Sequence, residues 1–302
     1  MITFSDLELV ATLCDSGSLS EAARKLRVTT AALSMRLRKL EAQLGLKLAS
    51  RDARRLVLTE EGERMAEEGR RLLRSLEELS ESMVADDEHL QGVIRLSAPF
   101  GFGRLRIAPL LARFAKLHPK LRVELDLQEA PWPDRNHCDA IIHIGPVSDS
   151  SWTAHTLASN ERWLCASPAY LKQHGTPKTP DDLLAHRCIC IRENADHATL
   201  WHLSQGQQRK SLRILAAMVS NDGAVARRWA EQDLGLVLRS QWDVVDSIAQ
   251  GSLTRVLSDW AFDTAPILLL IPPRKNRSRK VQALASFLNE SFKSKGPEKS
   301  RA

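Results

Sequence analysis

The chain has 302 residues, of which 43% are hydrophobic and 26% are charged, as in ordinary globular proteins. This length allows two or three compact units, each with its own core. No apolar run approaches the roughly 20 residues that a membrane helix needs. The start, MITFSDLELV, lacks the basic stretch and apolar core of a secretion signal. We therefore expect a cytoplasmic protein without a membrane partner.

The net charge of +6 is distributed in blocks. Residues 1–59 hold ten Lys and Arg against six Asp and Glu (+4), residues 60–88 hold four against eleven (−7), and residues 89–302 hold 29 against 20 (+9). A non-specific polycation would not place an acidic block directly after a basic one. The pattern therefore predicts a local patch near the N-terminus that faces nucleic-acid phosphates.

The first 44 residues are expected to form three helices. Apolar residues at helical spacing predict the first helix over residues 4–14. Ser18 and Glu21 are typical of a capping box at the start of the second helix. Residues 27–28 then form a turn, and Thr29 is a suitable N-cap for the third helix. Helix, turn and helix, followed by a short basic strand pair, predict a winged helix-turn-helix that places its third helix in the major groove of DNA.

The third helix has two distinct faces on a helical wheel. Leu33, Leu37, Leu40 and Leu44 form one apolar stripe that faces the core. The opposite face carries small and basic side chains that can approach bases and phosphates. An ordinary three-helix unit with a solvated basic face is the alternative. The candidate DNA-binding residues are Thr29, Thr30, Ala31, Ser34, Met35, Arg36 and Arg38 on this helix, and Arg51, Arg54 and Arg55 around the LVLT strand of the wing.

Residues 60–88 are expected to form one long helix, because they contain no proline and carry a seven-residue apolar repeat. Two copies joined along this seam would present two groove-reading helices to a palindromic site. Packing of the stripe on the chain's own body is the alternative. The seam consists of Met65, Gly69, Leu72, Leu76, Leu79 and Met83.

Residues 89–302 alternate strand and helix patterns and predict an α/β unit with one or more mainly parallel sheets. Expected strands are 93–97, 121–127, 140–144, 162–166, 187–191, 211–215, 234–239 and 267–271. Expected helices are 105–117, 168–174, 180–186, 222–232 and 278–292.

Several residues of this unit lie near the C-terminal ends of predicted strands, where open parallel sheets bind ligands. Some of them precede a helix N-terminus, which favours an anion. We therefore expect a cleft for a small, acidic ligand, although each of these residues could also be a simple cap or turn. The candidate ligand-binding residues are Ser97, Pro99, Phe100, Gly101, Gly145, Arg192, Asn221 and Asp222.

The five cysteines, Cys14, Cys138, Cys165, Cys188 and Cys190, include no CxxC pair. We interpret them as buried reduced thiols rather than redox or metal-binding groups. No second ligand pair with zinc-site spacing is present, so neither a metal nor a cofactor is expected.

Stretches along nearly the whole chain resemble the LysR-type transcriptional regulators. They include GSLSEAARKLRVTTAALSMRLRKLEAQLG, LVLTEEGE, GVIRLSAPFGFGR, DAIIHIGPVSDSS, LCASPAYLKQHGTP and the RIL…SNDGAV stretch. The chain looks most similar to the branch with SAPxxFG and CASPAYL signatures.

Two features depart from the family pattern. Met35 stands where many relatives have Arg, so it could contact a thymine methyl instead of a guanine. The prolines in PWPDRNHCD indicate a loop before the third strand of the unit.

The resemblance implies a homodimer or homotetramer that binds double-stranded promoter DNA, with a small-molecule effector between two lobes similar to periplasmic binding proteins. It implies a DNA-binding domain at 1–59, a dimerisation helix at 60–88 and a regulatory domain at 89–302. Lobe one would cover about 92–161 and 267–292, and lobe two about 162–266. Effector positions of the family map onto Ser97, Pro99, Phe100, Gly145 and Asn221-Asp222. Lobe closure would alter DNA bending and the access of RNA polymerase, a further possible partner.

Two other functions are the alternatives. An enzyme with a DNA-binding appendage would need a catalytic motif, and the chain has no P-loop, GxSxG, HExxH or complete GxGxxG. A non-specific architectural DNA binder would not need so large a second unit.

The basic run from Arg274 to Lys280 is expected to be a solvated surface, with extra DNA contact as the alternative.

Overall fold

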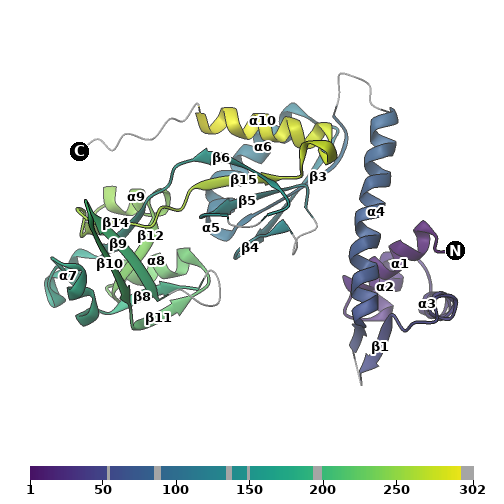
Figure 1. The fold of residues 1–302 in the computed structure, drawn as a ribbon, viewed down its shortest axis with the longest axis horizontal. Coiled ribbons are helices and arrows are strands. Elements are labelled where there is room, and N and C mark those ends of the chain that lie inside the picture. The colour runs from purple at the N-terminus through teal and green to yellow at the C-terminus, as the bar shows by residue number, and fades with distance from the viewer. Residues whose placement is uncertain (53–54, 85–89, 134–137, 148–149, 193–198, 294–302) are drawn as a thin grey trace. The chain divides into compact units, whose positions relative to one another are not determined.

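The computed structural model describes residues 1–52, 55–84, 90–133, 138–147, 150–192 and 199–293. The chain divides into two compact units, Met1–Glu88 and His89–Ala302 (Figure 1). None of the helices in the described ranges is both long and apolar enough to span a membrane.

The N-terminal unit is a helical body with one small hairpin, which confirms the predicted fold. Leu9, Leu13, Leu33 and Leu48 are almost fully buried in its core. The two strands pair antiparallel, from Ala49 opposite Leu58 onward. The elements are α1 (Phe4–Cys14), α2 (Leu19–Lys25), α3 (Thr30–Leu44), β1 (Ala49–Asp52), β2 (Arg55–Leu58) and α4 (Glu60–Val84).

Side-chain caps begin α2 and α3 as expected. The Ser18 hydroxyl accepts a hydrogen bond from the backbone N–H of Glu21, and the Thr29 hydroxyl accepts one from Ala32, both at 3.2 Å. The expected capping box at α2 is only half formed, because the Glu21 carboxylate accepts from the backbone N–H of Gly17 instead of Ser18. The other oxygen of the Glu21 carboxylate pairs with Lys25 at 3.1 Å on the next turn of α2.

Helix α4 serves two packing roles along its length. At Gly69 an added Cβ would lie 3.2 Å from the Leu7 side chain, so a larger residue there would force Leu7 to shift, and glycine favours this close approach of α4 to α1. Leu72, Leu76 and Leu79 are exposed by 48%, 38% and 56%. The predicted seam is therefore wrong in its N-terminal part, which packs within the unit, and the exposed part of the stripe begins at Leu72. The side chain of Met83 lies outside the described residues.

The C-terminal unit contains two five-stranded sheets, one in each lobe. The lobe-one sheet has the order β4-β3-β5-β15-β6, and the lobe-two sheet has the order β11-β8-β12-β7-β13. The lobe-one elements are β3 (Gly92–Pro99), α5 (Phe100–Phe102), the π-helical turn Gly103–Ile107, α6 (Ala108–Leu117), β4 (Leu121–Gln128), β5 (Ala140–Ile144), β6 (Thr153–Ala158), β15 (Ile267–Ile271), a 3-10 turn at Arg274–Asn276 and α10 (Arg279–Lys293).

Lobe two carries more strands than expected. A separate sheet, β10-β9-β14, packs beside the main one. The strand predicted at 211–215 overlaps only the end of β10, which stops at Arg213, and β11 begins at Ala216 and was not predicted. The elements are β7 (Arg162–Ala166), α7 (Pro168–His174), a 3-10 helix (Pro180–Ala185), β8 (Cys188–Ile191), β9 (Leu200–Gln205), β10 (Gln208–Arg213), β11 (Ala216–Ser220), α8 (Gly223–Glu231), β12 (Leu236–Ser240), α9 (Gln241–Ala249), β13 (Thr254–Val256) and β14 (Ala261–Phe262).

The expectation of mainly parallel sheets is wrong. In lobe one, β3 pairs parallel with β4 and β5, whereas β15 pairs antiparallel with β5 and β6. Lobe two repeats this pattern around β8 and β7. The antiparallel strands β15 and β7 are those that follow a crossing between lobes. A strand that enters its sheet from the other lobe starts at the hinge edge and therefore runs opposite to strands that end there.

Lobe one has its main core between the sheet and two helices, α6 and α10 (Figure 1). Phe114 of α6 and Phe287 of α10 lie with ring centroids 5.3 Å apart. Leu96 and Ala98 of β3 face this core, whereas Ile141 belongs to a smaller cluster elsewhere.

Two chain crossings near residues 160 and 265 join the lobes. Asn160 is 5% exposed, and its side-chain amide donates to the Ser240 hydroxyl at 3.0 Å and to the Ala265 carbonyl at 2.9 Å. The backbone N–H of Ala265 donates in turn to the Asn160 carbonyl. These bonds connect both crossings to each other and to the N-terminal end of α9. Hydrogen bonds therefore hold the two hinge segments together.

Candidate functional site

Helix α3 presents its non-core face to solvent. Met35 is 70% exposed, and Ala31 and Arg38 are also exposed, while Ser34 is half-buried beside them. Thr29 and Thr30 are exposed at the helix N-terminus. A face of small residues with one long apolar and one cationic side chain fits the floor and the wall of a DNA groove.

Arg36 differs from its neighbours because it is directed toward α1. Its guanidinium donates to the Ser5 hydroxyl and lies 3.5 Å from the Asp6 carboxylate. Burial raises the pKa of Asp6, but bonds from Thr3 and Arg36 outweigh it, so the net pKa lies below its usual value. Arg36 therefore fixes α3 against α1 and is engaged within the protein, unlike the outward-facing Arg38.

The wing is attached to α3 through a buried carboxylate that the sequence reasoning missed. Glu41 is 6% exposed and accepts from the backbone N–H groups of Leu48 and Ala49 at 2.9 and 3.4 Å. Lys47 adds an ion pair at 3.0 Å. Burial raises the pKa of Glu41, but these donors together bring it below its usual value. Its position four residues after Leu37, beside the leucine stripe, is the signal that could have revealed it.

Three candidate wing arginines cannot be placed in detail. Arg51 and Arg55 belong to β1 and β2, but their side chains lie outside the described residues, as does the whole of Arg54.

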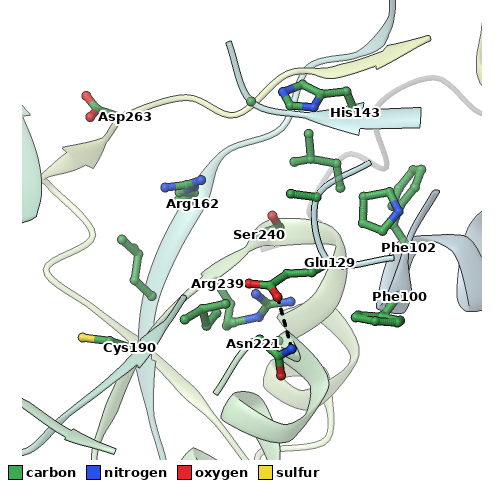
Figure 2. A pocket seen from close by; sticks show the side chains of 18 of the residues that line it. Phe100, Phe102, Glu129, His143, Arg162, Cys190, Asn221, Arg239, Ser240 and Asp263 are labelled. Atoms are coloured by element: carbon green, nitrogen blue, oxygen red, sulfur yellow. Dashed lines mark hydrogen bonds between the residues drawn. The ribbon is translucent and has the colours of Figure 1, made fainter. Parts of the chain in front are cut away.

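In the C-terminal unit, a cavity of about 560 Å³ lies between the lobes. Lobe one contributes the turn after β3, the loop after β4 and the end of β5; lobe two contributes β7, β8, β9, β12 and the start of α8. Figure 2 shows its main polar side chains. The acidic, basic and histidine lining residues are Glu129, His143, Arg162, His202, Arg239 and Asp263.

The candidate ligand-binding residues divide into two groups. Pro99, Phe100, Gly101, Gly145 and Asn221 line the cavity, as the strand-end argument anticipated.

Ser97, Arg192 and Asp222 are not among the lining residues. Ser97 is in register with Ile141, and side chains alternate along β3, so Ser97 lies on the face opposite Leu96 and Ala98. It is fully buried, and its hydroxyl has no hydrogen-bond partner among the described residues. Arg192 is exposed beyond β8. Asp222 accepts from the backbone N–H of Ala224 at 2.7 Å and so caps α8.

Two polar contacts join the lobes at the mouth of the cavity. The Asn221 amide donates to the Glu129 carboxylate at 3.1 Å (Figure 2). Arg104 of lobe one lies 3.2 Å from Asp222 of lobe two. Both contacts use the turn between β11 and α8, so this turn connects lobe two to lobe one.

Several lining residues could not be found from strand ends. Glu129 to Trp132 follow β4 as the proline-containing loop that the sequence predicted, and they form one wall. Arg162 begins β7, which runs in from the hinge, and its partner in the sheet is Ser240. Arg239 lies near the end of β12, where the charged residue in the LVLRS stretch is the signal that was overlooked.

Four of the five cysteines are buried, and Cys14 alone is exposed, contrary to the expectation for that residue. Burial raises the pKa of Cys165 and Cys188 to about 12 and that of Cys190 to about 11. These three thiols are therefore protonated at neutral pH. Within the described residues, no group of three or more His, Cys, Asp or Glu is arranged to hold a metal.

The basic run is only partly solvated. Arg274 and Lys275 are exposed, but Lys280 is 7% exposed and the Arg277 guanidinium donates to the Pro272 carbonyl.

The sequence comparisons agree with this architecture. Residues 4–63 match the bacterial regulatory helix-turn-helix domain of the LysR family, and residues 87–293 match the LysR substrate binding domain. The chain belongs to the LysR family of transcriptional regulators. Members of this family bind promoter DNA and small-molecule effectors and form oligomers.

Individual relatives cover nearly the whole chain. The HTH-type transcriptional activator TtdR of Escherichia coli UTI89 is 32% identical over 284 residues, covering 94% of this chain and 91% of TtdR. The regulator DmlR of Escherichia coli K12 is 32% identical over 289 residues, covering 95% and 94%.

Solved structures show the same fold. Full-length AphB of Vibrio cholerae, a virulence activator, is 27% identical, with a TM-score of 0.66 over 95% of this chain and 98% of AphB. CrgA of Neisseria meningitidis is 27% identical, with a TM-score of 0.61 over 97% and 99%. These relatives are regulators, so the chain is a transcriptional regulator and the enzyme alternative is not retained.

Proposed function

We propose that the protein is a sequence-specific promoter binder in which residues 1–59 read DNA, residues 60–88 pair two copies, and residues 89–302 sense an acidic effector. The exposed stripe of Leu72, Leu76 and Leu79 on α4 supports the pairing, since three large apolar side chains at heptad spacing suit a coiled-coil partner. Helix α4 belongs to the same compact unit as α3, so pairing would hold two α3 helices at a set separation.

We propose that each α3 enters a major groove. The exposed Met35 offers an apolar contact to a thymine methyl, and Arg38 can reach a phosphate or a guanine. Arg36, held by Asp6, would contribute mainly by fixing the helix. The wing would contact the backbone. The DNA-contacting set is Thr29, Thr30, Ala31, Ser34, Met35, Arg36, Arg38, Arg51, Arg54 and Arg55.

The effector would bind in the cavity between the lobes and change their closure. Arg162 and Arg239 supply positive charge on the lobe-two side, which supports an anionic effector. Occupation would alter the contacts that the β11–α8 turn makes with lobe one, change the geometry of the oligomer on DNA, and so change bending and the access of RNA polymerase. Dimers or tetramers both fit this scheme.

The observation that carries this proposal is the exposed, groove-compatible face of α3 in a unit that also carries the α4 stripe. Footprinting of the full-length protein on genomic promoter fragments tests it. We expect a two-fold symmetric footprint whose half-sites are about 10 base pairs or a multiple apart. Equal affinity for random duplex with a steep salt dependence would instead favour a non-specific architectural binder.

A further inference from the structure

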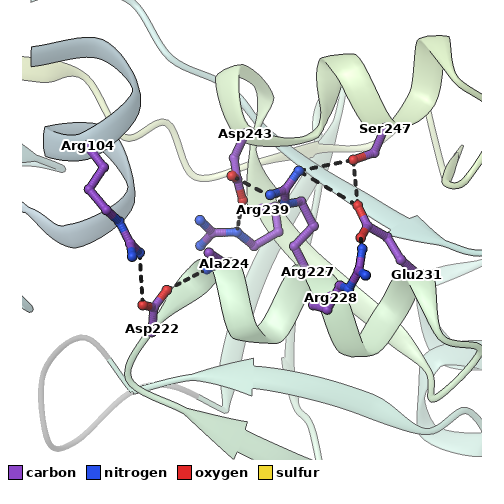
Figure 3. Close-up of polar contacts among 9 residues, drawn as sticks. All are labelled: Arg104, Asp222, Ala224, Arg227, Arg228, Glu231, Arg239, Asp243 and Ser247. Carbon is purple, nitrogen blue, oxygen red and sulfur yellow. Dashed lines mark hydrogen bonds and ion pairs between the residues drawn. The ribbon is translucent and has the colours of Figure 1, made fainter. Parts of the chain in front are cut away.

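Arg239 is a buried arginine at the wall of the cavity between the lobes. It is 7% exposed, and its Nε donates to the Asp243 carboxylate at 2.8 Å on the next turn of chain (Figure 3). Asp243 itself is 4% exposed. This contact uses only one edge of the guanidinium, which carries five donors in a planar fork.

The second oxygen of Asp243 faces another cation. Asp243 Oδ1 lies 3.5 Å from Nε of Arg227, an ion pair without a hydrogen bond, and Nη1 of Arg227 donates to the Ser247 hydroxyl at 3.2 Å. Figure 3 shows Asp243 between the two guanidiniums. No described residue is a hydrogen-bond partner of Nη1 or Nη2 of Arg239.

The position of Arg239 is also restricted from the side of α8. An added Cβ at Gly223 would lie 2.2 to 2.3 Å from the terminal guanidinium atoms of Arg239. Glycine at this position lets the guanidinium pack against the first turn of α8, whose N-terminal end favours negative charge. Asp243 therefore orients Arg239 through Nε, and Gly223 leaves room for its Nη edge.

A buried charge that is paired on only one edge is costly unless a second partner satisfies the other edge. The Nη atoms of Arg239 are not among the fully buried polar atoms that lack a partner, so a ligand can reach them from the cavity. A planar carboxylate there matches the guanidinium fork with two parallel, charge-assisted hydrogen bonds. We infer that Arg239 is the residue that binds the carboxylate of the effector and that Asp243 is its positioning residue. The inference rests on the proposed acidic effector of the previous section.

The test is a binding titration of the full-length protein with acetate, succinate and benzoate, each compared with its neutral amide. Trp201 and Trp242 line the cavity, so intrinsic fluorescence reports its occupation. For the tightest carboxylate, Arg239→Met should weaken binding about 10- to 100-fold, because a charge-assisted pair is lost. Binding of the amide should change less than about threefold, since it does not depend on that charge.

Three further variants separate recognition from general damage. Arg209→Met removes an equal charge from an exposed position in β10 and should leave binding unchanged. Arg239→Lys keeps the charge without the fork and should bind carboxylate more weakly than the wild type. If Arg239→Met does not fold, Arg239→Lys provides the test in its place. Asp243→Glu keeps the negative charge but displaces the oxygen that accepts from Nε of Arg239, so it should weaken carboxylate binding. Combining it with Arg239→Met should add little further loss, a non-additivity that independent structural damage would not produce.

The outcomes distinguish the two ideas. Carboxylate binding that survives in both Arg239 variants overturns the assignment of Arg239 while leaving the acidic effector in place. If none of the three carboxylates binds better than its amide to the wild type, the proposed acidic effector fails and the assignment fails with it.

Discussion

Replacing Glu41 with alanine is expected to destabilise the N-terminal unit by about 2–4 kcal/mol. Its carboxylate accepts from two backbone donors, Leu48 at 2.9 Å and Ala49 at 3.4 Å, and Leu48 is 1% exposed. A hydrogen bond to a charged group contributes about 1.5–3 kcal/mol, and a buried donor left without a partner costs a similar amount. The Lys47 pair adds little, since the Lys47 side chain is 77% exposed.

The composition of the chain suggests a clean assay. All seven tryptophans and the one tyrosine lie at residue 132 or later, so intrinsic fluorescence follows only the C-terminal unit, whereas helical circular dichroism follows both. Unfolding of the N-terminal unit should therefore appear in circular dichroism but not in fluorescence. Glu41→Ala should lower the midpoint temperature of that transition. For a unit of this size about 1 kcal/mol corresponds to roughly 4–8 °C, so the midpoint should fall by at least about 8 °C. DNA affinity should fall with it, because Glu41 anchors the wing to α3.

The pH dependence provides an independent check. The native pKa of Glu41 lies below its usual value of 4.5, so the unfolded state binds the proton more readily. The stabilisation is then fully present above pH 4.5 and is lost as the pH falls through the native pKa. The gap between the wild type and Glu41→Gln should close in that window. If Glu41→Ala costs less than about 0.5 kcal/mol, or no more than the exposed control Glu67→Ala, the reasoning about Glu41 is refuted.

Other substitutions probe the remaining sites. Ser34→Asp should abolish promoter binding in a gel-shift assay while sedimentation still shows dimers, because it sets a carboxylate against phosphates; wild-type affinity would place another face on the DNA. Leu76→Arg, at a position 38% exposed on α4, should break pairing and lower DNA affinity about 100-fold through loss of bivalency. Unchanged dimerisation would locate the interface elsewhere. Gly223→Ala should displace the Arg239 guanidinium and lower the affinity for carboxylate at least about tenfold in the fluorescence titration. An unchanged affinity would show that Arg239 does not bind the ligand.

Local patterns were sufficient where one element buries one face. The leucine stripe of α3 and the caps at Ser18 and Thr29 placed the helix-turn-helix almost to the residue, because helical periodicity and capping act within a few residues of chain. The same holds for β4 and α7, whose predicted bounds differ from the structure by at most one residue.

Local patterns failed where two elements share a surface. A heptad count cannot tell that Gly69 faces Leu7 while Leu76 remains exposed, since both have the same spacing on α4. Strand-end reasoning found Gly145 and Asn221 but not Arg239, which depends on the approach of β12, α8 and α9.

The order of residues alone determined the family, the helix-turn-helix and the separate α/β unit, because these depend on periodicities and short motifs within single segments. The direction of β7 and β15, the burial of Glu41 and the pairing of Arg239 with Asp243 were decided only by tertiary structure. In each case the energy comes from contacts between segments far apart in the chain or from burial by several elements at once. A single stretch of sequence does not reveal which partner will be near enough to satisfy a buried charge.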